Sequence, residues 1–321
     1  MISFIIIGRN EGWRLELCLT STVKVLTDGQ LDAEIIYVDS KSTDDSIKVA
    51  NQFSEVNTFL ITGRYNAAIA RNIGVKESKG DSLIFLDGDM EVNPDFLNLI
   101  LDEQGVLKHD FVSGNFMNYY YDVDGNFLRK DFYRKIYCEK DTLQNTTGGL
   151  FAVKRSVWDS VGGMRNMFKK GQDLDFGYRL ALKGIPLLRK KELMANHHTI
   201  DYNDTSRLWR SFIDGRYLYT RSVLYRSNFY NKYVIKRMLT SDPTWLLLIG
   251  MIVLAALTHQ VWPFMVYGFL TAIAVAYNMR KGSFVSYPNR LINHMCRDLY
   301  SLFAFIFIYP KRKLKLKYKR V

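Results

Sequence analysis

Short apolar runs alternate with helical patterns over residues 1–115, and this alternation constrains the fold more than any other feature of the sequence. Between the first two runs, apolar residues recur at helical spacing, and residues 66–77 show a further helical pattern. Repeated strand–helix–strand units predict an α/β fold, with a Rossmann-like, mostly parallel sheet and helices on both faces. The expected strands are rich in β-branched or aromatic side chains and lie at 3–7, 34–38, 58–61 and 82–86.

Two carboxylates follow the fourth apolar run, at the edge of the sheet where ligands bind in such folds. Asp87 and Asp89 are separated by one glycine, so both side chains can face one ion as the strand turns. Hard divalent cations prefer carboxylate oxygens, and a metal at this place could neutralise a diphosphate. The same spacing at Asp122 and Asp124 is typical of a hairpin turn, so the pattern alone is weak evidence.

Two common nucleotide-binding motifs are absent from the sequence. No GxGxxG follows the first apolar run, and no GxxxxGK[ST] occurs anywhere. NAD-dependent redox chemistry and P-loop hydrolysis are therefore disfavoured. The three cysteines are widely spaced, form no metal-binding pattern and favour a reducing, intracellular setting.

More than half of the formal net charge of +12 is concentrated in the last eleven residues. Residues 311–321 carry seven basic side chains and no acidic one, and they follow the apolar run 299–309. A basic cluster beside an apolar segment is attracted to anionic lipid by about 1 kcal/mol per residue near the surface. The sequence therefore favours anionic membrane lipid as a partner. It does not indicate a nucleic acid as a partner. A solvated, frayed terminus is the alternative.

Two uncharged runs, at residues 245–257 and 261–277, follow Pro243. As helices they would measure about 20 and 26 Å, against a hydrocarbon core of about 30 Å. Basic residues flank the pair on both sides, whereas the connecting turn carries no fixed charge. This pattern predicts a hairpin that dips into or crosses a membrane, with its flanks on the cytoplasmic face of the inner membrane. A buried helical pair of a soluble protein is the alternative.

The sequence is therefore expected to have four parts. They are an α/β domain at 1–200, an amphipathic connector rich in Arg and aromatic residues at 201–242, a hydrophobic helical hairpin at 243–278, and an interfacial helix with a basic tail at 279–321. The connector could bind a lipid-linked diphosphate or lie at the headgroup plane of a membrane.

Five motifs in a fixed order, within roughly residues 1–200, resemble those of glycosyltransferase family 2. The motifs are IIIGRNEG, YVDSKSTDDS, ARNIGVKESKGDSLIFLDGD, TTGGLFAVKRSVWDSVGGM and GQDLDFGYRLALKG. The resemblance implies the GT-A fold and a nucleotide-sugar donor, which would be a UDP-, GDP- or dTDP-sugar. It also implies a divalent metal, Mn²⁺ or Mg²⁺, as cofactor.

The resemblance further implies how the donor and the metal are held. The residues implied to contact the nucleotide sugar are Gly8, Asn10, Glu11, Asp39, Arg71 and Asp87. Within this set, Asp39 would contact the base, and Asp87 would face the ribose and the metal shell. Asp89 would bind the metal directly. His197 or His198 could complete the metal shell, although a structural pair of histidines is the alternative.

Asp173 matches the catalytic base of the family, and the residues matching positions near the sugar and the acceptor are Gly148, Gly149 and Gln172. The family usually has Glu where this chain has Gln172, so a like charge beside Asp173 is absent. For Asp175, capping and dipole pairing at the start of a helix is the favoured interpretation.

Together these features predict an inverting enzyme that transfers a single sugar to an acceptor held at a membrane. The QxxRW motif of processive synthases is absent, which favours single addition. The expected acceptor is a polyprenyl-diphosphate-linked saccharide in surface polysaccharide synthesis, and polyprenyl phosphate itself is the rival acceptor. Outside this class, the alternatives are a nucleotidyltransferase and a catalytically silent membrane scaffold.

Overall fold

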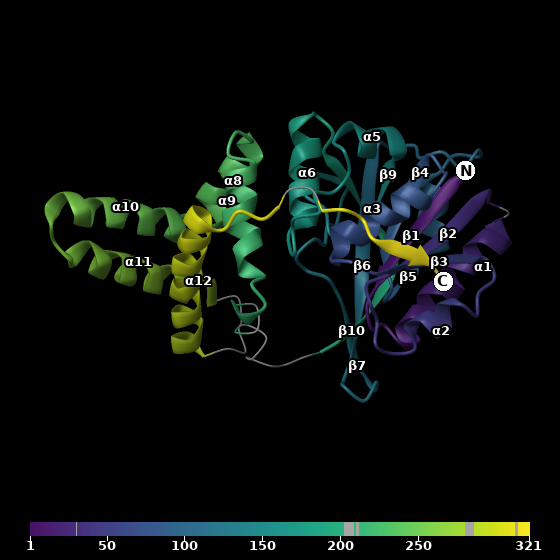
Figure 1. Cartoon of the computed structure of the whole chain (residues 1–321), viewed down its shortest axis with the longest axis horizontal. Coiled ribbons are helices and arrows are strands. Elements are labelled where there is room, and N and C mark those ends of the chain that lie inside the picture. Colours follow the sequence, from purple (N-terminus) through teal and green to yellow (C-terminus); the bar gives the residue numbers. More distant parts are fainter. Residues whose placement is uncertain (30, 202–208, 210–211, 280–285, 312–313) are drawn as a thin grey trace. The chain divides into compact units, whose positions relative to one another are not determined.

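The computed structural model describes residues 1–29, 31–201, 209, 212–279, 286–311 and 314–321. The chain divides into two compact units, each described by itself below. The α/β unit comprises Met1–Tyr202 together with Lys311–Val321, and the helical unit comprises Asn203–Pro310. In the sequence, the helical unit is therefore inserted between two parts of the α/β unit (Figure 1).

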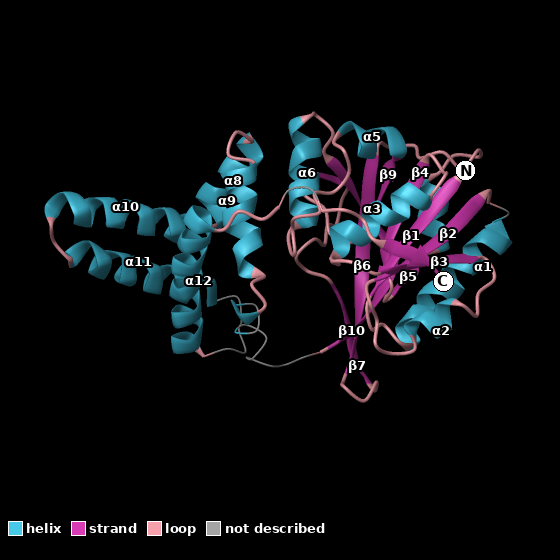
Figure 2. Cartoon of the chain, viewed as in Figure 1, coloured by secondary structure: helices cyan, strands magenta, loops and turns pink. Residues whose placement is uncertain are grey.

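One sheet forms the centre of the α/β unit (Figure 2). Its strands are β1 Ile2–Gly8, β2 Ala33–Asp39, β3 Val56–Ile61, β4 Ser82–Asp87, β5 Met90–Val92, β6 Phe111–Tyr121, β7 Phe127–Phe132, β8 Thr142–Gln144, β9 Phe151–Lys154, β10 Leu187–Ile200 and β11 Tyr318–Arg320. The strand order is β11-β3-β2-β1-β4-β9-β6-β10-β5, with β7 paired to β6 and β8 paired to β10. The four predicted strands are β1 to β4, and they pair with one another in parallel.

Helices cover both faces of this sheet, which confirms the predicted fold class (Figure 2). They are α1 Trp13–Gly29, α2 Ser46–Ala50, α3 Ala67–Glu77, α4 Pro94–Ile100, α5 Arg155–Ser160 and α6 Gln172–Leu182. Buried apolar residues of α1 and α4 join one hydrophobic cluster, whereas those of α3, α5 and α6 join the other. The sheet therefore has a packed core on each side.

The register of the parallel strands brings three strand ends to the same edge of the sheet. Gly8, the last residue of β1, is the partner of Asp39 at the end of β2. Ile7 is the partner of Asp87 at the end of β4. The loops that follow these strands therefore begin side by side. Further along the chain, the hairpin predicted around Asp122 is confirmed, because β6 and β7 pair antiparallel on either side of it.

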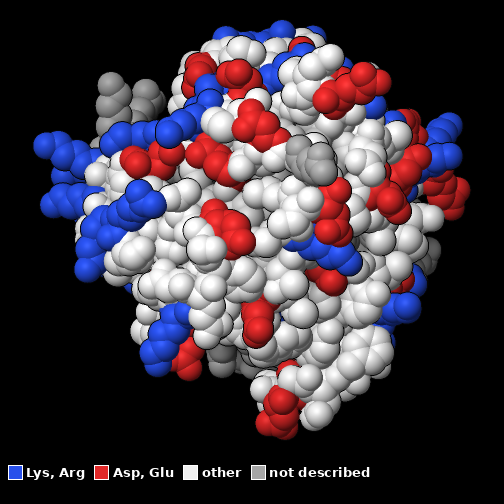
Figure 3. All heavy atoms as spheres, turned by 90° about the vertical axis from the view of Figure 1, so that its right-hand side faces the viewer, with Lys and Arg blue, Asp and Glu red and all other residues white. Residues whose placement is uncertain are grey.

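The basic C-terminal segment contributes a strand to this sheet, and here the expectation of a tail needs correction. β11 pairs antiparallel with β3, so it covers the edge of the sheet beside that strand (Figure 1). The predicted part 279–321 is thus divided between the two units. In Figure 3, basic side chains gather mainly at the left of the face shown, and acidic side chains are spread among and beside them.

The helical unit contains the two apolar helices that the sequence predicts. Its described helices are η1 Tyr219–Val223, α8 Leu224–Ser227, α9 Lys232–Ser241, α10 Pro243–Thr258, α11 Trp262–Met279 and α12 Tyr287–Phe307. α10 and α11 pack against each other as the predicted hairpin. By length and composition, α11 could cross a membrane, and α9 and α10 could do so together although their axes are bent by 83°. The predicted connector falls partly on residues 202–208 and 210–211, which lie outside the described residues.

Charged side chains lie inside the helical unit and large apolar side chains lie outside it. Arg221 is buried and forms ion pairs with Asp242 and Asp298, which are also buried. In contrast, Leu257 on α10 and Met265 on α11 are about three-quarters exposed. Soluble proteins have the opposite distribution, because charged residues are seldom buried and large exposed apolar areas are unfavourable in water.

Candidate active site

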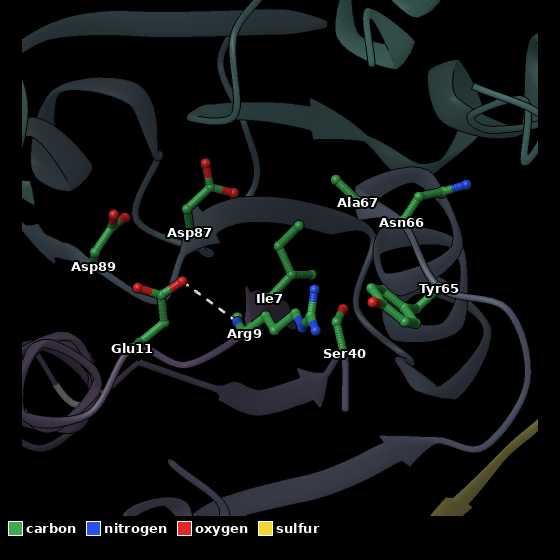
Figure 4. Close-up of a pocket in the computed structure, with 10 residues that line it drawn as sticks. Ile7, Arg9, Glu11, Ser40, Tyr65, Asn66, Ala67, Asp87 and Asp89 are labelled. Atoms are coloured by element: carbon green, nitrogen blue, oxygen red, sulfur yellow. Dashed lines mark hydrogen bonds between the residues drawn. The ribbon is translucent and has the colours of Figure 1, made fainter. Parts of the chain in front are cut away.

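A cavity of about 320 Å³ opens at the edge of the sheet where β1, β2 and β4 end (Figure 4). Its lining consists of Ile7, Gly8, Arg9, Glu11, Ser40, Tyr65, Asn66, Ala67, Asp87 and Asp89. The structure thus brings together four residues that the sequence predicts for the site, namely Gly8, Glu11, Asp87 and Asp89. The cavity combines backbone at the end of β1 with carboxylates from two loops, as the parallel register requires.

Three carboxylates of the cavity, Glu11, Asp87 and Asp89, form what is here called the acidic cluster (Figure 4). Burial raises the pKa of Glu11 to about 7, and repulsion from Asp89 adds to this effect. Burial likewise raises the pKa of Asp87, against the stabilising charge of Arg71. Carboxylates held this close favour protons or a cation, because like charges in a poorly solvated place repel each other.

Arg14 compensates part of this negative charge, although the sequence analysis did not identify it. Its guanidinium lies 2.8 Å from Glu11 Oε2 and 3.7 Å from Asp89 Oδ2. Arg14 stands three residues after Glu11, at the start of α1, and this i, i+3 spacing in the first motif could have indicated the contact.

A metal ion would find suitable ligands around Asp89. Its Oδ1 atom is buried and has no hydrogen-bond partner among the described residues. Its Oδ2 atom lies 3.1 Å from Nε2 of His197, and Nδ1 of that imidazole lies 2.8 Å from Oδ1 of Asn118. Within the described part of the chain, no group of three or more His, Cys, Asp or Glu side chains forms a complete metal site. An open site with few protein ligands is what Mg²⁺ or Mn²⁺ uses when substrate phosphates supply the rest.

The two histidines face different neighbours, which separates the alternatives left open by the sequence. Neighbouring residues of a strand point to opposite faces, and both histidines lie in β10. His198 Nε2 lies 3.2 Å from Glu91 Oε2, and its Nδ1 lies 2.9 Å from the Tyr121 hydroxyl. His197 is therefore the better candidate for a metal ligand. Burial disfavours its charged form, but the Asp89 carboxylate outweighs this effect and raises the pKa of His197.

Arg71 and Gly149, which both lie against Asp87, form what is here called the inner wall of the site. The Arg71 side chain is buried, and Nη2 donates a 2.6 Å hydrogen bond to Asp87 Oδ1. Nε and Nη1 of Arg71 are buried without a hydrogen-bond partner among the described residues. Gly149 lies so close that a Cβ atom there would be 2.1 Å from Asp87 Oδ2, whereas a Cβ atom on Gly148 would meet nothing within 4 Å. Of these two glycines, only Gly149 lies so close to its neighbours that a side chain would not fit.

Asp39 does not line the cavity. The residue is fully buried, and its carboxylate accepts hydrogen bonds from the Ser42 amide at 2.8 Å and the Tyr37 hydroxyl at 3.0 Å. The Ser42 hydroxyl also donates to it. In this geometry Asp39 braces the loop after β2, and the neighbouring Ser40 faces the cavity. The expected contact between Asp39 and the base stays a prediction, and in this structure protein groups occupy the carboxylate.

Asn10 connects the loops that follow β1 and β2. Its backbone has a left-handed φ of 58°. Its amide oxygen accepts a 2.8 Å hydrogen bond from the Thr43 backbone, and its own backbone donates to the Ser42 hydroxyl at 2.9 Å. Asn10 thus fastens the loop after β1 to the loop after β2. Asparagine tolerates this backbone conformation better than most other residues.

Asp173 lies in the first turn of α6, where the backbone enters through Gly171 at a left-handed φ of 81°. Burial raises the pKa of Asp173; the charge of Arg71 opposes this rise, and Asp87 adds a smaller increase. The influence of these two charges means that the first turn of α6 lies near Arg71 and Asp87. A raised pKa makes this carboxylate a stronger proton acceptor at neutral pH.

The residues around Asp173 have separate roles. Gln172 Oε1 is buried and has no hydrogen-bond partner among the described residues. Asp175 is buried and pairs with Arg165 and Arg179, each at 2.9 Å, which agrees with the structural role favoured by the sequence. Gly177 allows α6 to approach the chain before Gly148, because a Cβ atom there would lie 2.7 Å from Thr146 Cα.

The sequence profile of the family described as "Glycosyl transferase family 2" matches residues 3–170, which is more than half of the chain. The chain belongs to glycosyltransferase family 2. Its α/β unit is accordingly a GT-A fold, with the acidic cluster at the carboxyl ends of the parallel strands. The resemblance inferred from the five motifs is thereby confirmed.

Several glycosyltransferases are similar to this family 2 chain. Glycosyltransferase AglE of Haloferax volcanii is 26% identical over 204 residues, which are 61% of this chain and 66% of AglE. Glycosyltransferase GlyG of Streptococcus pneumoniae serotype 4 is 29% identical over 131 residues, which are 40% of this chain and 42% of GlyG. Each match spans less than two thirds of the relative's own length.

Among solved structures, the mannosyltransferase PcManGT from Pyrobaculum calidifontis, in complex with GDP-Man and Mn²⁺, has a similar fold. The TM-score is 0.55 at 15% sequence identity, over 95% of this chain and 87% of PcManGT. At this identity the similarity concerns the fold alone.

Proposed function

We propose that this family 2 enzyme transfers one sugar, with inversion, from a nucleotide-diphosphate sugar to an acceptor hydroxyl held at a membrane. The observation that carries this proposal is the acidic cluster with His197 beside it. Asp173 supports it, because this buried carboxyl is close enough to Arg71 and Asp87 for their charges to influence its pKa. A metal-dependent diphosphate site and a general base would then lie on either side of the reacting carbon.

The donor would lie in the cavity described above, with its diphosphate toward Asp89. Asp89 and His197 would hold Mn²⁺ or Mg²⁺, with Asp87 beside them. A divalent cation bound there would neutralise the negative charge that develops on the leaving diphosphate. The free Nε and Nη1 groups of Arg71 could donate hydrogen bonds to the donor. The buried Asp89 Oδ1 atom without a partner supports this use of the site.

Asp173 would act on the acceptor. Its carboxylate takes the proton of the acceptor hydroxyl while the hydroxyl oxygen forms a bond to the anomeric carbon. The bond between that carbon and the diphosphate oxygen breaks, and the nucleoside diphosphate leaves from the opposite face. A single displacement of this kind inverts the configuration, and general-base help contributes about 10² to 10⁴ in rate. Asp173 later gives its proton to water.

The acceptor would be a polyprenyl-diphosphate-linked saccharide at the cytoplasmic face of the inner membrane. Support comes from the helical unit, whose outer surface is apolar and whose interior holds the Arg221 ion pairs. Such a distribution suits a lipid environment, where charges must be paired inside the protein. The composition of α11 agrees with a membrane location. Polyprenyl phosphate is the second candidate acceptor.

A donor panel tests the proposal. Purified protein in detergent with Mn²⁺ would receive UDP-, GDP- and dTDP-sugars, with and without a membrane lipid extract. We expect nucleoside diphosphate release from one donor, dependent on the extract and lost in Asp173→Asn and Asp89→Ala. Mass analysis of the lipid product separates a lengthened saccharide from a lipid-phosphate sugar. Release of inorganic diphosphate, or no release by folded protein, would contradict the proposal.

A further inference from the structure

Residues 314–318, here called the strap, run along the side of the α/β unit and lead into β11. Leu314, Leu316 and Tyr318 pack against the core on the face of the sheet that α3 covers. The lysines between them, Lys315 and Lys317, are exposed. Tyr318 opens β11 and is the partner of Ile61, the last residue of β3 (Figure 1). The strap therefore ends beside the point where β3 passes into its following loop.

That following loop, residues 62–66 and here called the donor loop, is bonded directly to the strap. The Lys317 carbonyl accepts hydrogen bonds from the amides of Thr62 at 2.9 Å and Gly63 at 3.1 Å. The approach is close, because a Cβ atom on Gly63 would lie 3.0 Å from Lys317 Cβ. Two residues further on, the donor loop places Tyr65 and Asn66 in the wall of the cavity (Figure 4).

Asn166 provides a second link between the strap and the cavity wall. Its amide nitrogen donates a 3.2 Å hydrogen bond to the Leu314 carbonyl. Its backbone carbonyl accepts a 2.8 Å hydrogen bond from the Asn66 side chain. Its amide oxygen accepts a 2.6 Å hydrogen bond from Asn72, the neighbour of Arg71 on α3. Both ends of the donor loop are thus fixed through contacts that involve the strap.

We propose that the strap holds the donor loop in the conformation that binds the nucleotide, so that Lys317 and Asn166 are positioning residues for the donor. Without the strap, the amides of Thr62 and Gly63 lose their protein partner, and the loop gains conformational freedom. Donor binding must then order the loop, and this entropy cost weakens affinity. The inference rests on the function proposed above and adds the part of the chain that prepares the donor site.

The strap also continues the helical unit, because Pro310 is the last residue of that unit and Lys311 belongs to the α/β unit. The strap, which is bonded to the donor loop, is thus close in sequence to the last helix of the helical unit. A purely structural role, in which β11 merely covers an exposed sheet edge, is the competing explanation. The two differ in what they predict for nucleotide affinity in a protein that remains folded.

The experiment compares the full chain with a chain that ends at Pro310, by titration with UDP and GDP in the presence of Mn²⁺. For the nucleotide that the full chain binds, we expect the Kd of the shortened chain to rise about tenfold. A synthetic peptide of residues 311–321 should restore the affinity by adding the missing strand in trans. A scrambled peptide of the same composition should not, which excludes attraction of the nucleotide by basic charge alone.

Two substitutions in the full chain keep the inference testable if the shortened chain fails to fold. Asn166→Ala should raise the Kd and the donor KM about threefold, with kcat unchanged, since the side chain loses its hydrogen bonds to the Leu314 carbonyl and to Asn72. Arg320→Ala is the matched control, because this exposed side chain bonds Asn57, away from the donor loop. Its Kd should equal that of the full chain.

Unchanged nucleotide affinity in both the shortened chain and Asn166→Ala would overturn the inference while leaving the proposed function intact. An equal rise in Arg320→Ala, or a fall in kcat together with the unfolding temperature and no change in KM, would favour mere edge protection and also overturn it. Failure of the folded full chain to bind any nucleoside diphosphate would overturn the proposed function together with this inference.

Discussion

The two units of the molecule both bury charged side chains, but they compensate the charges differently. In the helical unit, the positive charge of Arg221 is paired with the negative charges of Asp242 and Asp298. Each of these three side chains therefore has an ion-pair partner. In the α/β unit, the three carboxylates of the acidic cluster share one cavity, and Asp89 Oδ1 has no partner among the described residues. Buried like charges are costly unless a counterion or proton joins them. The comparison indicates that the paired charges build structure and that the acidic cluster is available to a ligand.

Removing Arg221 should have the largest effect, and this effect should be on stability. Arg221→Met removes the buried guanidinium that pairs with both Asp242 and Asp298, which costs about 3–5 kcal/mol. Thermal unfolding in detergent would show a strongly lowered transition temperature. Arg216→Ala is the control, since its ion pair with Asp214 is exposed and such pairs contribute about 0–1 kcal/mol. Equal transition temperatures for the two variants would contradict the structural role of the buried pairs.

Adding a methyl group at Gly149 should reduce activity without a comparable loss of stability. In Gly149→Ala, the new Cβ atom would collide with Asp87, and a displacement of about 1 Å at a catalytic site can cost about a hundredfold in rate. Gly148→Ala is the matched control, because nothing lies within 4 Å of its Cβ position. The measurement is kcat/KM for nucleoside diphosphate release. Similar values for both variants would mean that the Asp87–Arg71 contact is not part of the reaction site.

Replacing the two histidines separately should sharpen the assignment of the metal ligand. We expect His197→Ala to weaken Mn²⁺ binding at least about tenfold, because metal ligands and their orienting partners contribute about 10–100-fold each. His198→Ala should have a smaller effect, since this imidazole contacts Glu91 and Tyr121. Calorimetric titration with Mn²⁺ measures both. A larger loss in His198→Ala would reverse the assignment.

The pH dependence of turnover should show the state of Asp173. Its pKa lies above the ordinary carboxyl value because the group is buried, so the fraction that can accept a proton falls as the pH is lowered. We therefore expect kcat/KM to decline with decreasing pH through a range above that ordinary value, and to be constant above it. The residual turnover of Asp173→Asn should decline less than that of the wild type, because only Glu11, whose pKa is about 7, and the rest of the acidic cluster still titrate. An unchanged profile in the variant would mean that another group controls the rate.

Much of the α/β unit could be predicted from the sequence because its signals are local. The four parallel strands follow from β-branched apolar runs of strand length, and Asp87 and Asp89 follow from the end of one such run. The sequence also placed Asp175 at the start of a helix, and α6 begins at Gln172. Each of these signals depends on spacing within a few residues.

The parts that could not be predicted depend on contacts between distant segments. The Asp39 carboxylate is buried and accepts hydrogen bonds from Tyr37 and Ser42, and a motif does not show such partners. For the histidine pair, strand alternation predicts that only one imidazole faces the site, but choosing His197 required its distance to Asp89. Neither fact is visible in spacing alone.

The sequence contains a pattern that indicates the C-terminal strand, but the positive charge of the segment favoured another interpretation. Residues 314–319 alternate Leu, Lys, Leu, Lys, Tyr and Lys, which is the period of a strand with one buried face. The high positive charge favoured a membrane-attracted tail instead. The apolar members of the series pack on the core, and the lysines remain in solvent.

The most direct test of the account separates donor binding from turnover in one pair of variants. Asp173→Asn and Asp89→Ala would be compared with the wild type for Mn²⁺-dependent nucleoside diphosphate binding and for sugar transfer in the presence of lipid extract. The account predicts that Asp173→Asn binds the nucleotide as the wild type does and loses about 10² to 10⁴ in rate. It predicts that Asp89→Ala loses both metal-dependent binding and transfer. Near-normal transfer by Asp173→Asn, or metal-dependent binding retained in Asp89→Ala, would contradict the assignment of base and metal site.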